Sequence, residues 1–271
     1  MYQAARQGLL SVVVVDLSPQ DDRRTGRPGA SELRVEMLGT FRARVDGRDV
    51  TEALVGRSRA VFQYLLLAAG PVPRDVLIDV CWPEFDVERG RNNLNVAITG
   101  IRRALGSREV VRHSGGAYRI DPALDVWLDV DTFTELVQAA HRLDADHGDG
   151  VTGLYRRAVA LYRGELLPES RYCEWLEPRR RFLAHAHLDA VKRLAACCRT
   201  EGNLYEAAWA AQLGLLVDDL DEELVESWLQ TLADRRANRQ LHAVLQTYSD
   251  RLEEELGVAP SDRLLALAAG L

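Results

Sequence analysis

Side chains suited to reading DNA bases lie along one side of the segment 91–105, RNNLNVAITGIRRAL. Its apolar residues recur at helical steps and predict a helix with one inward face: Leu94, Ile98, Ile101 and Leu105. The predicted outward residues are Asn92, Asn95, Val96, Thr99 and Arg103, with Arg91 and Arg102 on the flanks. Asn pairs with adenine, Arg with guanine, and Val or a Thr methyl with the thymine methyl. The pattern therefore suits a DNA major groove.

A polar helix face is also typical of any amphipathic helix in contact with solvent, so its position in the chain matters. Alternating stretches between Leu33 and Val45, followed by the turn Asp46-Gly47, predict short antiparallel strands. Predicted helices at 59–69 and 73–81 come next, and a glycine hairpin with strands near 110–112 and 117–120 follows the third helix. This order predicts a winged helix-turn-helix whose third helix is the reader.

The predicted hairpin supplies further cations. Arg112, His113 and Arg119 flank its glycine tip, where they are placed to reach phosphates or a minor groove. An ordinary surface turn is the alternative reading of the same residues, and we expect Tyr118 to belong to the core.

The length of 271 residues favours two domains. We assign residues 1–32 to a flexible leader, 33–121 to the winged helix-turn-helix, and 122–271 to an all-α domain. After Pro122 we expect helices near 131–147, 151–163, 174–201, 204–217, 221–236, 239–256 and 261–269. The stretches 188–221 and 222–255 each have the 34-residue tetratricopeptide period, though the consensus is degenerate. The predicted fold class is mainly α with a small β component.

Charge is distributed unevenly between the two predicted domains. Residues 33–121 hold 14 Arg against 11 Asp and Glu, whereas residues 122–271 hold 16 basic against 26 acidic residues. A mildly basic module joined to an acidic one is typical of a DNA reader with a protein-facing partner domain. The overall net charge of −7 would by itself argue against nucleic acid.

Neither catalytic chemistry nor a metal site is indicated. The sequence contains no glycine-rich phosphate loop, no G-x-S-x-G and no H-E-x-x-H motif. The four cysteines show no C-x-x-C spacing, and the acidic run from Asp218 to Glu223 fits charge at a helix N-terminus better than a cation site. No apolar run is long enough to span a bilayer. We expect a cytoplasmic protein that is not an enzyme and uses no cofactor.

The chain resembles the Streptomyces antibiotic regulatory protein family from about Leu33 to its C-terminus. The matching stretches in the first predicted domain are Leu38-Gly39, Asp46-Gly47, Arg57-Ser58-Arg59-Ala60, Leu77-Ile78-Asp79 with Trp82, Arg91-Asn92-x-Leu94, Ile101 to Leu105, and Gly116-x-Tyr118-Arg119. Those in the second are Asp131-x-Phe133, Leu161 to Glu165, Trp175-x-Glu177 and Leu256-Gly257-Val258-x-Pro260.

This resemblance implies an OmpR-like winged helix joined to a bacterial transcriptional activation domain. It further implies an activator that binds direct repeats at promoters as side-by-side protomers and contacts the sigma and alpha subunits of RNA polymerase. Within the matching stretch at the first helix, we expect Arg57 and Arg59 to lie near the DNA backbone, although Arg57 also fits an exposed loop charge.

Two positions depart from the family pattern. Ala97 and Gly100 stand where the family commonly has His and Arg, and a glycine inside a helix costs about 1 kcal/mol relative to alanine. These departures leave a second hypothesis open. In that alternative, the chain is a tetratricopeptide-like adaptor whose winged helix no longer reads DNA.

Overall fold

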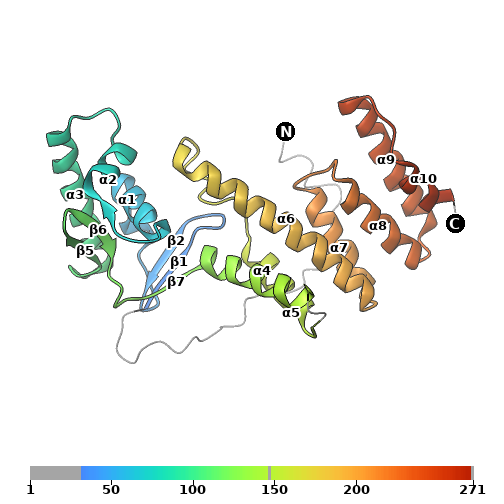
Figure 1. The fold of residues 1–271 in the computed structure, drawn as a ribbon, viewed down its shortest axis with the longest axis horizontal. Coiled ribbons are helices and arrows are strands. Elements are labelled where there is room, and N and C mark those ends of the chain that lie inside the picture. Colours follow the sequence, from blue (N-terminus) through green and yellow to red (C-terminus); the bar gives the residue numbers. More distant parts are fainter. Residues whose placement is uncertain (1–31, 146–147, 270–271) are drawn as a thin grey trace.

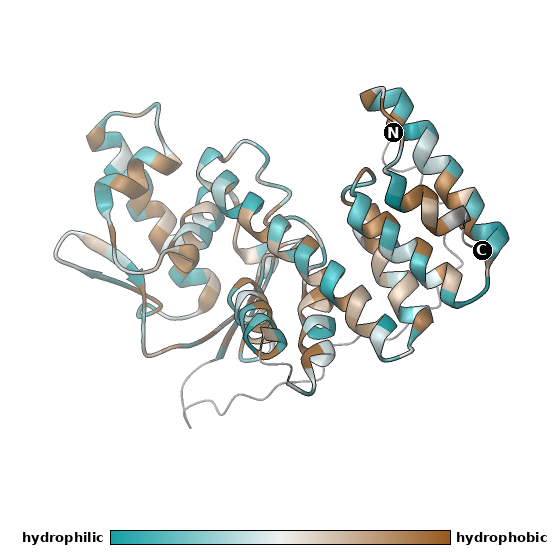
Figure 2. Cartoon of the chain, turned by 45° about the vertical axis from the view of Figure 1, so that its right-hand side comes forward, coloured by the Kyte–Doolittle hydropathy of each residue, from teal (hydrophilic) through white to brown (hydrophobic). Residues whose placement is uncertain are grey.

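The computed structural model describes residues 32–145 and 148–269. Figure 1 shows an elongated molecule, with a mixed β and α part at one end and helical hairpins stacked toward the other. Hydrophobic and hydrophilic residues alternate around most of the helices, as expected for helices that pack on one side only (Figure 2). The predicted leader lies outside the described residues except for Glu32, which begins the first strand.

The N-terminal part has the predicted order of strands, three helices and a terminal hairpin. Its elements are β1 (Glu32–Glu36), β2 (Arg42–Val45), β3 (Arg48–Asp49), α1 (Gly56–Leu67), β4 (Val72–Pro73), α2 (Arg74–Cys81), α3 (Val87–Leu105), β5 (Val111–Ser114) and β6 (Ala117–Ile120). A short 3-10 helix at Thr51–Ala53 precedes α1. The predicted fold class, a winged helix followed by an α-helical repeat domain, is confirmed.

Two small sheets frame these helices. One has the strand order β3-β2-β1-β7, and the other has the order β4-β6-β5. The strand β7 (Asp125–Leu128) lies parallel to β1, so the prediction that everything after Pro122 is helical was wrong at this segment. Four residues are too few to show a clear period, and the strand that pairs with β7 lies about 90 residues earlier in the chain.

The C-terminal part consists of antiparallel helices near the predicted positions. They are α4 (Asp129–Ala145), α5 (Val151–Leu161), α6 (Glu177–Thr200), α7 (Leu204–Leu215), α8 (Glu222–Asp234), α9 (Asn238–Leu256) and α10 (Asp262–Ala269). A 3-10 helix at Glu174–Leu176 leads into α6. Successive helices pack against one another as hairpins, which fits the tetratricopeptide-like prediction.

The hydrophobic core crosses the expected domain boundary at residues 121 and 122. One cluster of buried side chains runs without a break from Leu33 in β1 to Leu224 in α8. A second, smaller cluster joins α8, α9 and α10. The division of the chain at residue 121 therefore stays a proposal about function, because packing alone does not separate the two parts.

We call the contacts between the two parts the joint. Its centre is Asp129, which is fully buried and accepts the backbone N–H of Met37 at 2.8 and 2.9 Å and that of Leu38 at 2.9 Å. Burial raises the pKa of Asp129 to about 6, although these N–H groups and Arg163 act in the opposite direction. The carboxylate thus satisfies two backbone donors that lie directly after β1.

Two further arginines lie at the joint: Arg179 bonds across it, and Arg180 fixes residues 166–170 on its helical side. Arg179 donates to the carbonyl of Leu67 at the end of α1 (2.7 Å), beside the edge-to-face contact of Trp175 with Tyr64. Arg180 is only 5% exposed and donates to the carbonyls of Leu166, Leu167 and Ser170, and it pairs with Glu177 at 2.7 Å. The joint therefore fixes the helical part against both the first sheet and α1.

Candidate nucleic-acid interface

Helix α3 is held at both ends by local signals in the sequence. The Asp86 side chain caps it by accepting the N–H of Arg89 at 2.8 Å, and Gly106 ends it in the left-handed conformation at φ +74°. Leu94, Ile98 and Ile101 are buried against the other helices, as predicted. These contacts fix which side of α3 faces outward.

Gly100 is explained by the crossing of α3 over α1. A side chain at this position would collide with the hydroxyl of Ser58. Gly100 therefore suits the close approach of the two helices, because a larger residue would force the Ser58 side chain to turn away. Ala97 is 3% exposed, so it too belongs to the core. The two departures from the family pattern alter packing and leave the outward side chains unchanged.

We call the outward side of α3 the reading face. Its members are exposed, as predicted: Asn92, Asn95, Val96, Thr99 and Arg103. Val96 is 70% exposed, the largest fraction among the exposed valines of the described residues. No acidic residue occurs between Asn92 and Leu105. The face therefore presents amides, methyl groups and a cation to whatever binds it.

Thr99 uses its hydroxyl within the helix. Its Oγ1 donates to the carbonyl of Asn95 at 2.8 Å, one turn earlier. Among the groups that could meet a base, the Thr99 methyl is then more available than the hydroxyl donor. This fits the predicted contact with a thymine methyl better than a hydrogen bond to a base edge.

The arginines predicted around α3 fall into two groups. Arg91 and Arg103 are exposed and have no ion-pair partner within 32–145 or 148–269. Arg102 is half-buried, and its Nη2 donates to the carbonyl of Val111 in β5 at 2.8 Å. Arg102 therefore ties α3 to the hairpin, whereas Arg91 and Arg103 are free to meet an anion.

The hairpin β5–β6 forms the predicted wing. Gly115 and Gly116 both have positive φ, the geometry of a tight two-residue turn. Arg112 and Arg119 lie directly opposite each other, but Arg112 pairs with Asp121 at 2.9 Å and holds the pKa of that carboxyl below its usual range. Arg119 is exposed and has no such ion pair among the described residues.

His113 packs beside Tyr118, with ring centroids 4.4 Å apart. Tyr118 is 7% exposed, so it belongs to the core as expected, whereas His113 stays exposed on the wing.

The two arginines predicted near the first helix have different surroundings. Arg59 donates to the carbonyls of Leu54 and Thr51 at 2.6 and 3.0 Å and lies over the Phe41 ring. Its guanidinium therefore holds the start of α1 in place, and we leave it out of the proposed phosphate contacts. Arg57 is exposed and 3.9 Å from Glu84.

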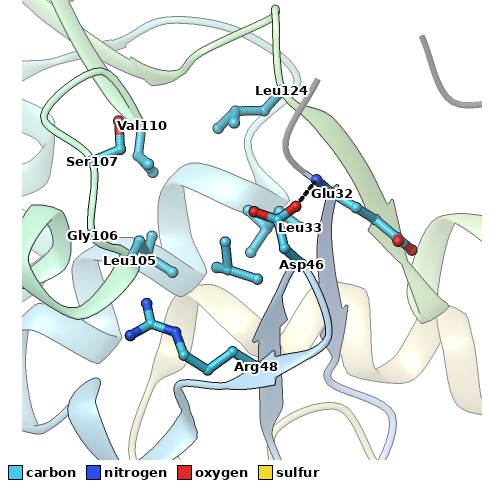
Figure 3. Close-up of a pocket in the computed structure, with 10 residues that line it drawn as sticks. Glu32, Leu33, Asp46, Arg48, Leu105, Gly106, Ser107, Val110 and Leu124 are labelled. Atoms are coloured by element: carbon cyan, nitrogen blue, oxygen red, sulfur yellow. Dashed lines mark hydrogen bonds between the residues drawn. The ribbon is translucent and has the colours of Figure 1, made fainter. Parts of the chain in front are cut away.

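A shallow cavity of about 440 Å³ lies at the C-terminal end of α3. The Arg48 guanidinium points toward Gly106, and the Asp46 carboxylate accepts the N–H of Glu32 at 2.8 Å (Figure 3). Leu105 lines the cavity from α3 and is buried, so the cavity is on the sheet side of the helix and separate from the reading face.

Other kinds of site find little support in the described part of the chain. It contains no group of three His, Cys, Asp or Glu side chains that could hold a metal. The acidic run serves α8 instead, because Asp221 caps the helix and Lys192 pairs with Asp221 and Glu223 at 2.7 and 2.8 Å. No helix in the described residues is long and apolar enough to cross a membrane.

Sequence reasoning missed the contact that joins the wing to the helix-turn-helix. The backbone N–H of Arg74, the first residue of α2, donates to the carbonyl of Gly116 at 2.9 Å, and β4 pairs with β6. Neither contact leaves a periodic signal, because each involves one or two residues separated by more than 40 positions.

Comparisons with known proteins give two findings. Residues 128–271 match the family described as the bacterial transcriptional activator domain, which is more than half of the chain. The fold is similar to that of Mycobacterium tuberculosis EmbR in complex with a low affinity phosphopeptide, with a TM-score of 0.72 and 19% identity. That match covers 88% of this chain and 64% of EmbR, so the chain spans less than two thirds of that protein. A search of curated proteins gave no match.

Proposed function

We propose that this chain, a transcriptional regulator of the Streptomyces antibiotic regulatory protein kind, activates transcription by binding specific DNA sequences. The chain belongs to the family with a bacterial transcriptional activator domain. In this proposal α3 enters the major groove and the wing contacts the neighbouring backbone. The target is double-stranded promoter DNA, and the site of action is the cytoplasm.

The reading face carries this proposal. An exposed valine between two exposed asparagines, with free arginines on the flanks and no acid, suits base edges and phosphates together. The burial of Leu94, Ile98 and Ile101 on the opposite side of α3 leaves this face outward.

We assign different roles to the exposed residues. Arg91, Arg103 and Arg119 are the proposed phosphate contacts, because each is exposed and free of an ion pair in the described residues. Asn92, Asn95, Val96 and Thr99 are the proposed base contacts. Arg57, Arg112 and His113 are secondary contacts at the edge, and Arg102 positions the wing from its bond to Val111.

The partners of the helical part follow from the family. We propose that it contacts the sigma and alpha subunits of RNA polymerase while protomers lie on direct repeats, and that the regulated genes form a biosynthetic operon. The acidic balance of residues 122–271 supports a protein-facing role for this part.

A gel-shift experiment with a salt series tests the proposal. The protein is titrated onto the DNA upstream of its own gene and onto a scrambled duplex of equal length. Sequence-specific binding predicts a preference for the natural fragment. The logarithm of the affinity should fall linearly with the logarithm of the salt concentration, because counterions are released. Equal, weak affinity for both duplexes at every salt concentration would reject it.

The adaptor hypothesis makes the opposite prediction for this experiment. It was motivated by Gly100, which we now attribute to the close crossing of α3 and α1. The remaining support is the modest positive charge of residues 33–121. If neither duplex bound and the chain instead retained protein partners through its winged helix, the adaptor reading would take precedence.

A further inference from the structure

The last helical hairpins present different chemistry at their two ends. At one end, the turn before α8 meets the end of α9, because Tyr248 donates to the carbonyl of Leu220 at 3.2 Å and Arg251 pairs with Asp219. At the other end, the start of α7 meets the end of α8, because the Arg235 guanidinium lies 4.4 Å from the centroid of the Tyr205 ring. Antiparallel packing thus separates two edges.

We call the first of these the acidic edge. It combines exposed apolar side chains with carboxylates: Leu216, Val217, Leu256, Val258, Glu253 and Glu254. Leu216 is 62% exposed and Leu256 is 59% exposed. Neighbouring apolar side chains exposed to this degree are typical of a surface that meets a partner.

We call the second the basic edge, made of Tyr205, Arg235, Arg236 and Arg239. Tyr205 is 76% exposed, and Arg236 ends α8 at a φ of +57°. Arg239 has no ion pair among the described residues. Tyrosine and arginine are the residue types that contribute most to binding at protein interfaces.

We propose that the acidic edge of one copy docks on the basic edge of a second copy. Charge complementarity favours this occupant, because the glutamates of one edge meet the arginines of the other. Leu256 and Val258 then cover the Tyr205 ring, which gives the contact an apolar centre inside a charged rim. Both halves of the interface are present on the same chain.

The symmetry of this contact has a consequence on DNA. Two different edges meet, so the contact is heterologous and lets the copies follow one another head to tail without a two-fold axis. Direct repeats require this relation, whereas inverted repeats require a two-fold axis. The 19 residues of α9 separate the edges by about 28 Å, of the same order as the roughly 34 Å of one DNA turn. This step rests on the proposed DNA-binding function, whereas the contact itself does not.

Two charge-reversal variants test the contact. The first is Arg235→Glu with Arg239→Glu, and the second is Glu253→Arg with Glu254→Arg. Sedimentation velocity at low salt, over a series of increasing concentrations, reports self-association without DNA. A probe with one binding site and a probe with two sites report affinity and cooperativity separately. Arg142→Glu with Arg181→Glu reverses two exposed charges outside both edges and serves as the control.

We expect wild type and the control to self-associate. The association constant of each edge variant should be at least about tenfold lower than that of wild type. An equal mixture of the two edge variants should regain association, because one intact acidic edge can still meet one intact basic edge, and the two reversed edges are again opposite in charge. One-site affinity should not change.

Monomeric wild type at all concentrations, with independent filling of two sites, would overturn the proposal. So would edge variants that associate like wild type. If the protein bound no DNA at all, the proposed function would fail and the sedimentation result alone would decide the inference.

Discussion

Arginines at the joint and on the reading face differ in what they contact. At the joint, Arg179 and Arg180 donate to backbone carbonyls. Arg103 on the reading face and Arg91 on its flank contact no carboxylate in the described part of the chain. The same residue type therefore builds the protein in one region and is left available in the other. An exposed arginine without a partner in the protein, more than arginine as such, indicates a surface that can bind an anion.

Several of the family-like motifs contribute to the joint and not to the reading face. Arg163, Gly164 and Trp175 belong to the stretches shared with the family, and the structure places them at the joint, where Arg163 pairs with Glu36 at 2.9 Å. These family-like stretches therefore report how the helical part is attached to the winged helix. They say little about which DNA sequence the protein reads.

The largest expected effect is at Arg180. Arg180→Ala removes four hydrogen bonds from a nearly fully buried guanidinium and leaves three carbonyls without this donor. We expect the free energy of unfolding to fall by about 3–5 kcal/mol, measured by urea denaturation. Arg181→Ala, at the exposed neighbouring position, is the matched control and should change stability by less than about 0.5 kcal/mol. Equal losses in both variants would remove the distinction between engaged and available arginines.

Buried His187 makes the free energy of unfolding depend on pH. Its ring is buried, stacks on Tyr162 at 4.1 Å, and has a pKa lowered by burial to about 4. The unfolded chain takes up a proton near pH 6.5, before the folded protein does, so the stability that His187 contributes is full above pH 6.5 and falls as the pH drops toward 4. Asp129, whose pKa is raised to about 6, contributes in the opposite direction over the same range. The expected loss from His187 is on the order of 3 kcal/mol.

Replacing the ring by a non-titrating one isolates this contribution. The unfolding free energy of His187→Phe, relative to that of wild type, should rise as the pH falls from 6.5 to 4, whereas His185→Gln, at an exposed position of the same helix, should keep the wild-type slope. A wild-type slope in His187→Phe would show that other groups cause the acid sensitivity.

Two adjacent residues, Arg102 and Arg103, allow a bonded arginine and a free arginine to be compared directly. Arg103→Ala should leave stability unchanged and lower the slope of log affinity against log salt by about 1, because one phosphate contact is lost. Arg102→Ala should cost about 1 kcal/mol of stability through its lost bond to Val111, with a smaller change in slope. Thermal unfolding and a salt series on both variants measure this, and the reverse pattern would exchange the two assigned roles.

The sequence predicted more of the fold than of the contacts that hold it together. Helix α3 was predictable because its apolar period, its glycine stop and its polar face agree over 19 residues. The strand β7 was not, because its identity depends on β1, far away in the chain. The same reason hid the role of Asp129, whose partners are the backbone groups of Met37 and Leu38.

For the candidate site, the sequence predicted the residue types on α3 and the wing. It could not predict which of these side chains already bond to other groups of the protein. Only the folded structure shows that Arg59 binds the carbonyls of Thr51 and Leu54, or that Arg112 is neutralised by Asp121. Gly100 is a further example, since a helix position without a side chain has no sequence signal for the neighbour that requires it.

The central claim is that α3 reads DNA bases. The most direct test is the ratio of the affinities for a preferred site and for random DNA. A preferred site is selected from a random pool with wild-type protein, and Asn92→Ala and Asn95→Ala are measured on that site and on random duplex. Alanine keeps the helix, so we predict a loss of about 1–3 kcal/mol on the selected site and a much smaller loss on random DNA. If both variants kept the wild-type ratio of the two affinities, α3 would not be the reader.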